Sequence, residues 1–205
     1  MVNKIKDTTT EEKILEAARK VFIERGLDGA RMQEIADKAG INKALLHYYF
    51  RSKDKLFEVI FKETAGNLFP KFEMILNSDK PLFDKIDEIV SNYIDLIIKN
   101  PYLPLFVLSE MNKSRNLQLA NFFEMQRNKF VEKFVQNIEK EIKKGVIKKI
   151  SPAHLIINIF SLCAFPFIAK PVIGILLEID DLQFKYMMEQ RKKIVTDFII
   201  ASIKK

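Results

Sequence analysis

Residues 41–53 read INKALLHYYFRSK. At the 100° turn of an α-helix, the apolar and aromatic side chains of this stretch gather on one half of the helical wheel: Ile41, Leu45, Leu46, Tyr49 and Phe50. The other half carries a cation, a small residue, an imidazole and a phenol: Lys43, Ala44, His47 and Tyr48. It contains no Asp or Glu. The stretch therefore predicts a short helix with one buried face and one face suited to an anionic partner.

Two further helices are predicted before this stretch. The first begins at the Thr8-Thr9-Thr10 run, which precedes two acidic residues, and Gly26 can end it in the left-handed conformation. Its apolar residues recur at helical spacing: Ile14, Leu15, Ala18, Val21 and Phe22. The second helix spans residues 31–39, Gly40 closes it, and Asn42 can cap the next helix through its side-chain oxygen. Two short helices joined by a Gly-containing turn indicate a helix-turn-helix.

At these residues the chain resembles the TetR (tetracycline-repressor) family of bacterial transcription regulators. That family's signature runs from Ile-Ala through an Ala-Gly-Val-Ser turn to Leu-Tyr-x-x-Phe-x-Ser-Lys-Glu-x-Leu. The matching segments here are Ile35-Ala36, Ala39-Gly40-Ile41-Asn42 and residues 46–56. The resemblance extends over residues 11–60, and several consecutive elements keep the correct spacing. It implies an all-α protein with an N-terminal three-helix DNA-binding domain, residues 1–52, and a larger helical domain for effector binding and dimerisation, residues 53–205.

The chain departs from the family pattern at four positions. Asn42 replaces the usual Ser, and both residues cap a helix. Ala30 stands where a Thr commonly caps the second helix and touches a phosphate, so Arg31 becomes the candidate for that contact. Ala44 stands where Gly is frequent, which holds the backbone slightly farther from a base. His47 replaces a common Tyr, and its charge can change near neutral pH.

The resemblance implies a role for each candidate DNA-binding residue. Lys43 and Ala44 would face base edges, the lysine donating to guanine and the alanine permitting close approach or touching a thymine methyl. Phosphates would be held by His47, Tyr48 and Lys53, with the N-terminal dipole of the fourth helix assisting. Arg31 and Asn42 complete the set of candidates. The wheel places Leu45 on the buried half.

Composition is consistent with a DNA-binding protein of the cytoplasm. The 205 residues carry a formal net charge of +7, and basic residues cluster around Asp54 at Lys43, Arg51, Lys53 and Lys55. Cys163 is the only cysteine, so no intrachain disulfide can form and a reducing compartment is favoured. Residues 1–7 lack the apolar core of a secretory signal.

Helical patterns also dominate the rest of the chain, and no segment sustains the period-2 alternation of a strand. The fourth helix should begin at Ser52 and run toward Phe69, where Pro70 ends or kinks it. Ser151-Pro152 should open another helix with a cap and a proline at its first position. The remaining predicted helices occupy residues 79–99, 101–111, 116–144 and 180–203.

The last two helices of the chain are apolar nearly all round, so either an intramolecular core or a second subunit must cover them. Residues 155–177 contain a single charge, Lys170, in a length that could cross a bilayer, but Pro166, Pro171 and Gly174 interrupt them. We therefore expect buried helices and no membrane contact. A helix that is apolar nearly all round must be buried on every side. Contact with a second subunit is the simplest way to bury the remaining apolar surface. A homodimer would also suit a palindromic operator in double-stranded DNA.

The middle of the chain should enclose a pocket for a hydrophobic small-molecule effector, by resemblance rather than by any motif. The candidate contacts are Phe106, Met111, Phe122, Met125 and Phe160, in helices that also carry Phe123 and Phe130. The two histidines, His47 and His154, form no metal-ligand spacing, and no phosphate loop or catalytic triad order is present. We thus expect no enzyme, no metal and no cofactor.

Two other functions remain open. One is a soluble helical protein that binds a lipid or drug without binding DNA. The other is a membrane-associated protein anchored by residues 155–177.

Overall fold

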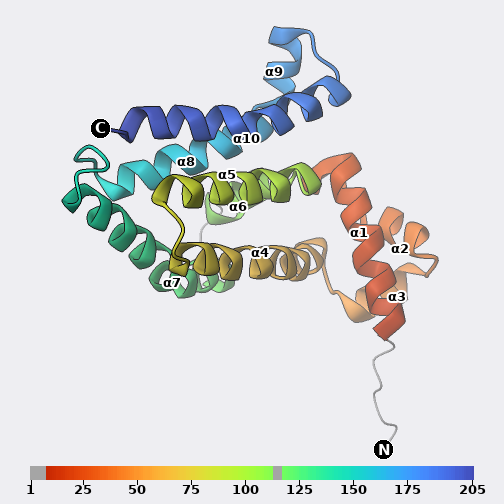
Figure 1. Ribbon diagram of the computed structural model, residues 1–205. Coiled ribbons are helices and arrows are strands. Elements are labelled where there is room, and N and C mark those ends of the chain that lie inside the picture. Colours follow the sequence, from red (N-terminus) through yellow and green to blue (C-terminus); the bar gives the residue numbers. More distant parts are fainter. Residues whose placement is uncertain (1–7, 113–116) are drawn as a thin grey trace, which may run out of the picture. The chain divides into compact units, whose positions relative to one another are not determined.

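The protein is described by a computed structural model, which covers residues 8–112 and 117–205 (Figure 1). Within them lie ten helices and no strand beyond an isolated bridge between Ile147 and Lys204, which confirms the all-α fold. Residues 1–7, on which the signal-peptide argument depends, and the predicted helix start at Asn116 lie outside this coverage. The chain divides into two compact units, residues 1–66 and 67–205. The functional boundary predicted after residue 52 stays a prediction.

The N-terminal unit contains α1 (Thr8–Gly29), α2 (Met32–Ala39), α3 (Lys43–Tyr49) and the first part of α4 (Lys53–Asn77). Its core is formed by fully buried residues of all four helices: Ile14, Val21, Phe22, Ile35, Leu46 and Phe57. Gly26 interrupts the first helix as predicted, but helical structure resumes after this kink and reaches Gly29. Gly26 has φ 68° and ψ 175°, a backbone conformation that is almost confined to glycine.

Hydrogen bonds at the helix ends fix where the helices of the helix-turn-helix begin and end. Gly40 adopts the left-handed conformation and its N–H donates to carbonyls of the last turn of α2. The Asn42 side-chain oxygen accepts from the Leu45 N–H at 2.8 Å, and the Ser52 hydroxyl accepts from the Lys55 N–H at 3.2 Å. These bonds confirm the predicted caps of α3 and α4.

The fourth helix runs through its proline and ends at Asn77, seven residues beyond Pro70. Of the two predicted effects of Pro70, an end or a kink of the helix, the end is therefore wrong. Proline has no N–H, so the Gly66 carbonyl lacks the helical hydrogen bond from residue 70 that it would otherwise accept. The division between the two compact units falls directly after Gly66.

The C-terminal unit is built around α5 (Leu82–Lys99), whose buried side includes Ile86, Ile89, Val90 and Ile94. It also contains α6 (Leu103–Asn112), α7 (Leu117–Lys143), α8 (Pro152–Ile168), α9 (Lys170–Leu177) and α10 (Asp181–Ile203). Helix α10 packs against α5 and α8, so these three helices lie side by side (Figure 1).

The predicted apolar stretch 155–177 is divided between α8 and α9, which meet at 71°. No single described helix is long and apolar enough to cross a membrane, and α8 with α9 meets that condition only as a bent pair, by length and composition alone. Pro152 occupies the first turn of α8 as predicted, but the Ser151 side chain makes no capping bond. At the start of α10, Asp180 and Gln183 form a reciprocal capping box.

Candidate nucleic-acid interface

The exposed face of α3 collects four of the predicted DNA-binding side chains. Lys43, Ala44, His47 and Tyr48 are all exposed, and Tyr48 leaves 64% of its surface accessible. Leu46 and Phe50 are buried and hold the helix to the unit. Ala44 and Lys43 follow directly on the Asn42 cap, so they occupy the first turn of the helix.

The structure corrects the placement of Leu45, which is 37% exposed rather than buried. The seven-residue helix packs mainly against α2. This contact buries less than half of the circumference of α3, so Leu45 stays exposed. Leu45 therefore adds an apolar side chain to the surface that carries Lys43 and Ala44.

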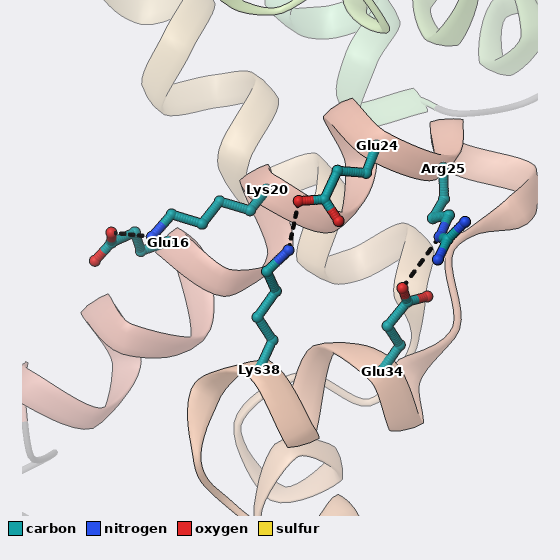
Figure 2. A network of polar contacts seen from close by, with 6 residues as sticks. All are labelled: Glu16, Lys20, Glu24, Arg25, Glu34 and Lys38. Carbon is teal, nitrogen blue, oxygen red and sulfur yellow. Dashed lines mark hydrogen bonds and ion pairs between the residues drawn. The ribbon is translucent and has the colours of Figure 1, made fainter.

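The charged side chains between α1 and α2 are paired with one another. Figure 2 shows two ion pairs that join α1 to α2, Lys38 to Glu24 at 2.6 Å and Arg25 to Glu34 at 3.2 Å. The hydrogen bond from Lys38 holds the pKa of the Glu24 carboxyl below its usual value. Arg19 of α1 pairs with Glu63 of α4.

A second set of cations has no such partner. Within residues 8–112 and 117–205, the side chains of Arg31, Lys43 and Arg51 make no ion pair and no hydrogen bond. Arg31 directly precedes α2, Lys43 begins α3, and Arg51 follows α3. The positive charge that the protein leaves unneutralised in this unit is thus concentrated at the helix-turn-helix, with Lys13 of α1 as its other unpaired cation among the described residues.

Two predicted phosphate ligands are already engaged by main-chain carbonyls. His47 Nδ1 lies 3.2 Å from the Arg51 carbonyl oxygen. Lys53 Nζ donates to the Asp28 carbonyl oxygen at 3.2 Å, which ties the start of α4 to the last turn of α1. Both side chains remain near the surface, so an incoming anion would compete with or add to these bonds.

The candidate effector residues are divided between a buried aromatic cluster and the surface. Phe122 and Phe160 contact the cluster, with ring centroids 5.7 Å from Phe69 and 5.7 Å from Phe130 respectively. Phe106 is also buried in the C-terminal unit. Met111 and Met125 are 46% and 62% exposed.

An open groove of about 410 Å³ lies beside the aromatic cluster. Its lining comes from α4 and α7: Phe69, Phe123, Glu124, Gln126, Phe130 and Val131. None of the five candidate effector residues is in this lining, although Phe122 contacts the lining residue Phe69 and Phe160 contacts the lining residue Phe130.

Comparison with known proteins identifies the family. A model described as "Bacterial regulatory proteins, tetR family" matches residues 14–60, and one described as "Tetracyclin repressor-like, C-terminal domain" matches residues 83–199. The chain belongs to the TetR family. Its two matched regions include the helix-turn-helix and most of the C-terminal unit, so the predicted resemblance is confirmed.

The TetR-family chain is also similar to individual regulators. It is 22% identical over 134 residues to the HTH-type transcriptional repressor KstR2 of Mycolicibacterium smegmatis, a match that covers 65% of each chain. It is 25% identical over 148 residues to IcaR of Staphylococcus aureus, the negative transcriptional regulator of the biofilm operon icaADBC, covering 62% of this chain and 77% of IcaR. The chain spans about half of the nucleoid occlusion factor SlmA of Haemophilus influenzae, 51% of its length, and 65% of KstR2.

Solved structures of other transcriptional regulators share the fold over nearly the whole chain. The hemolysin II transcriptional regulator HlyIIR has a TM-score of 0.59 and 25% identity, covering 96% of this chain and 97% of that one. FadR of Bacillus subtilis, solved in complex with stearoyl-CoA, has a TM-score of 0.60 and 17% identity, covering 90% and 97%. The second likeness concerns the fold alone.

The sequence prediction omits Leu45 and Phe69 from the two candidate sites of the TetR-family chain. The helical wheel places Leu45 on the buried half, whereas its side chain is exposed in the structure. Phe69 lies far along the sequence from the other residues that line the groove, so no local pattern marks it. Among the described residues no cluster of three His, Cys, Asp or Glu side chains could hold a metal ion.

Proposed function

We propose that this TetR-family protein regulates transcription, as a repressor, by binding double-stranded DNA through α3. The observation that carries the proposal is the contrast in ion pairing. Apart from Lys13, the described cations of α1 and α2 are paired with carboxylates, whereas Arg31, Lys43 and Arg51 have no protein partner in the described residues and lie at the helix-turn-helix. Unpaired cations beside an exposed helix suit a polyanion, because each phosphate contact releases condensed counterions.

The roles of the side chains follow from their positions on α3. Lys43 would donate to guanine in the major groove, while Ala44 and Leu45 would contact thymine methyl groups. Asn42 uses its oxygen to cap the helix, so its amide N–H groups are the part that can donate to DNA. His47, Tyr48 and Lys53 would bind phosphates, and Arg31 would do so from the start of α2.

We further propose that the protein forms a homodimer whose interface lies along α8, α9 and α10. The dimer would bind a palindromic operator. Helix α10 exposes large apolar side chains at steps of four or eight residues: Leu182, Tyr186, Ile194 and Phe198, each between 57% and 76% accessible. Helix α8 exposes Ile157 and Phe165, and α9 buries none of its residues. Exposed apolar surface on this scale favours a protein partner, and two-fold symmetry would present two copies of α3 to two half-sites.

The groove beside Phe69 is our candidate for the effector site. It is lined by three phenylalanines and by Gln126, and its volume of about 410 Å³ suits a hydrophobic small molecule. Binding there would change DNA affinity only if the ligand prefers one arrangement of the protein over another. Mass measurement of the freshly purified protein under native conditions would detect a ligand that it retains.

The DNA role is tested by selecting duplexes from a random pool and then measuring affinity at several salt concentrations. We expect Lys43→Ala to relax sequence choice, since it removes a contact to a base edge. Arg31→Ala and Lys53→Ala should weaken binding to all sequences and lower the salt slope by about one unit each. Lys149→Ala removes an exposed and unpaired cation from the C-terminal unit and should change neither property.

Retention of no duplex by the unaltered protein would exclude DNA binding. The alternative, a helical lipid- or drug-binding protein without DNA binding, would then be favoured by the aromatic groove. A DNA-binding regulator must act where the chromosome is, so we place the protein in the cytoplasm.

A further inference from the structure

The hydrogen bond of His47 limits what this side chain can offer to a phosphate. Its Nδ1 lies 3.2 Å from the main-chain carbonyl oxygen of Arg51. A carbonyl oxygen only accepts, so Nδ1 must carry the hydrogen. A neutral imidazole has one N–H, and Nε2 is therefore a bare acceptor as long as the ring is uncharged.

Phosphate oxygens are also acceptors, so a neutral His47 would present a lone pair to an anion. Only the imidazolium, which carries hydrogens on both nitrogens, can keep the Arg51 carbonyl and donate Nε2–H to a phosphate. We propose that His47 binds a DNA phosphate only in its protonated form, so that DNA binding takes up one proton for each reading helix. This inference rests on the proposed function, since it assigns a proton to one contact of the same site.

The charged groups on the segment that carries His47 do not supply an alternative partner. Lys43 lies one turn before it and Arg51 one turn after it, and both are cations. The only other titratable side chains on α3 are those of Tyr48 and Tyr49, whose rings pack edge to face at 5.7 Å.

The charged groups of α2, the helix packed against α3, are engaged elsewhere. Glu34 pairs with Arg25, and Lys38 pairs with Glu24 (Figure 2). Asp37 accepts a hydrogen bond from Gln33 at 2.8 Å.

The charged groups at the neighbouring ends of α1 and α4 also form no ion pair with His47 in the described residues. Lys53 donates to the Asp28 carbonyl oxygen, and Lys55 pairs with Glu58 at 3.0 Å. Asp54 and Asp28 are the remaining carboxylates there, and in the part of the chain that the structure describes no carboxylate forms an ion pair with His47. The anion that holds the imidazolium is then a phosphate of the DNA, which couples the proton to the complex.

The coupling has a definite direction and size. Histidine is the side chain that changes charge between about pH 5 and 8, so affinity should fall as the pH rises through that range. A linked proton changes the binding constant by up to about tenfold per pH unit, and a dimer with two reading helices by up to about a hundredfold.

The test measures affinity of the full-length protein for a fluorescent duplex carrying the selected operator, from about pH 6 to about pH 8.5 at constant ionic strength. We expect the unaltered protein to lose affinity across this range. His47→Tyr should bind with little pH dependence, because a phenol donates its O–H throughout. His47→Phe should be weak at every pH. His154→Gln removes the other imidazole and should keep the pH dependence of the unaltered protein.

A second measurement reads the tautomer directly. Long-range ¹⁵N–¹H correlation spectra of the DNA-free protein, assigned by comparison with His47→Tyr, should show the Nδ1–H form of His47 at alkaline pH. An Nε2–H tautomer would contradict the proposal.

The affinity data can overturn the proposal in two other ways. Equal pH dependence in the unaltered protein and in His47→Tyr would assign the effect to another group or to none. An affinity that rises with pH would mean that neutral Nε2 accepts from a base instead. In both cases the DNA-binding function would stand, whereas failure of both proteins to retain any duplex at any pH would overturn the function together with the inference.

Discussion

The Leu76 carbonyl near the end of α4 accepts from two side chains of distant segments. Lys85 Nζ donates to it at 3.0 Å and Asn137 Nδ2 at 3.2 Å, and Lys85 also donates to Asn137 Oδ1 at 2.8 Å. Burial lowers the pKa of the Lys85 ammonium, which is the expected direction for a cation removed from water. The trio joins α4, α5 and α7 at one point.

We expect Lys85→Met to destabilise the protein by about 1–3 kcal/mol, since it removes two hydrogen bonds from a charged donor and leaves Asn137 partly unsatisfied. Urea unfolding followed by circular dichroism measures the loss. Lys80→Met is the matched control, because Lys80 forms an exposed ion pair with Glu88 that should be worth less than about 1 kcal/mol. Equal losses in the two variants would show that the buried lysine contributes no more than a surface pair.

Glu58 is a buried carboxylate held by two lysines of its own helix. Burial raises its pKa, but hydrogen bonds from Lys62 and Lys55 outweigh that effect and hold the pKa below 4.5. The ionised form is thus favoured in the folded protein, so its contribution to stability is present above about pH 4.5 and is lost as the pH falls through the folded-state pKa.

Glu58→Gln should therefore reduce the drop in Tm between about pH 5.5 and pH 3.5, because the variant has no such carboxylate to protonate. Differential scanning calorimetry at several pH values measures the drop. Glu12→Gln, at an exposed carboxylate of α1, should retain the full acid dependence. A Glu58→Gln profile parallel to that of the unaltered protein would refute the assignment.

At the scale of elements, α8 contains a proline whose missing N–H is replaced from another helix. Pro166 cannot donate to the Leu162 carbonyl oxygen, and Arg191 of α10 donates its Nε–H there at 2.9 Å. Between these helices Cys163 is fully buried, and burial raises its thiol pKa to about 12, so it is inert at neutral pH.

A double-mutant cycle tests whether Arg191 replaces the missing N–H of Pro166 as the donor to the Leu162 carbonyl oxygen. Arg191→Met alone should cost about 1–3 kcal/mol, because a part-buried carbonyl loses its partner. In a Pro166→Ala background, residue 166 regains an N–H that can bind Leu162, so the same Arg191→Met change should cost less. Equal costs in both backgrounds, measured by urea unfolding, would mean that Arg191 acts through packing alone.

The elements that the sequence predicts well are those whose ends depend on neighbours within four residues. Gly40, Asn42 and Asp180 mark boundaries through bonds to their own turn, and each is where the pattern places it. Such signals are local, so one sequence contains them in full.

The predictions that fail depend on contacts between distant segments. Pro70 does not end α4, since packing of Phe69 and Phe72 against Phe130 of α7 stabilises the helix on either side of it. Leu45 is exposed because only one helix supports α3 closely, which a helical wheel cannot express. The groove at Phe69 joins residues 54 or more positions apart, and no local pattern marks it.

For the whole molecule, the exposed apolar residues of α8 to α10 make association the central expectation. Phe198→Glu places a charge on a side chain that is 63% exposed in one subunit and that a partner would cover. We expect a monomer by light scattering and a weaker complex with a palindromic duplex. Met74→Glu changes a similarly exposed apolar residue on α4, at 66%, and should keep the mass of the dimer. A Phe198→Glu dimer of unchanged affinity would place the interface elsewhere.

Helix α9 has a consequence for how long the protein survives in a cell. Eight residues are too few for a stable isolated helix, and none of them is buried in its own subunit. Its order should then depend on association, so a dilute solution should open the Leu176–Leu177 segment first. Chymotryptic cleavage there would become faster as concentration falls. A regulator present at a few copies would in this way be degraded sooner than one that is abundant, and its turnover would follow its own concentration.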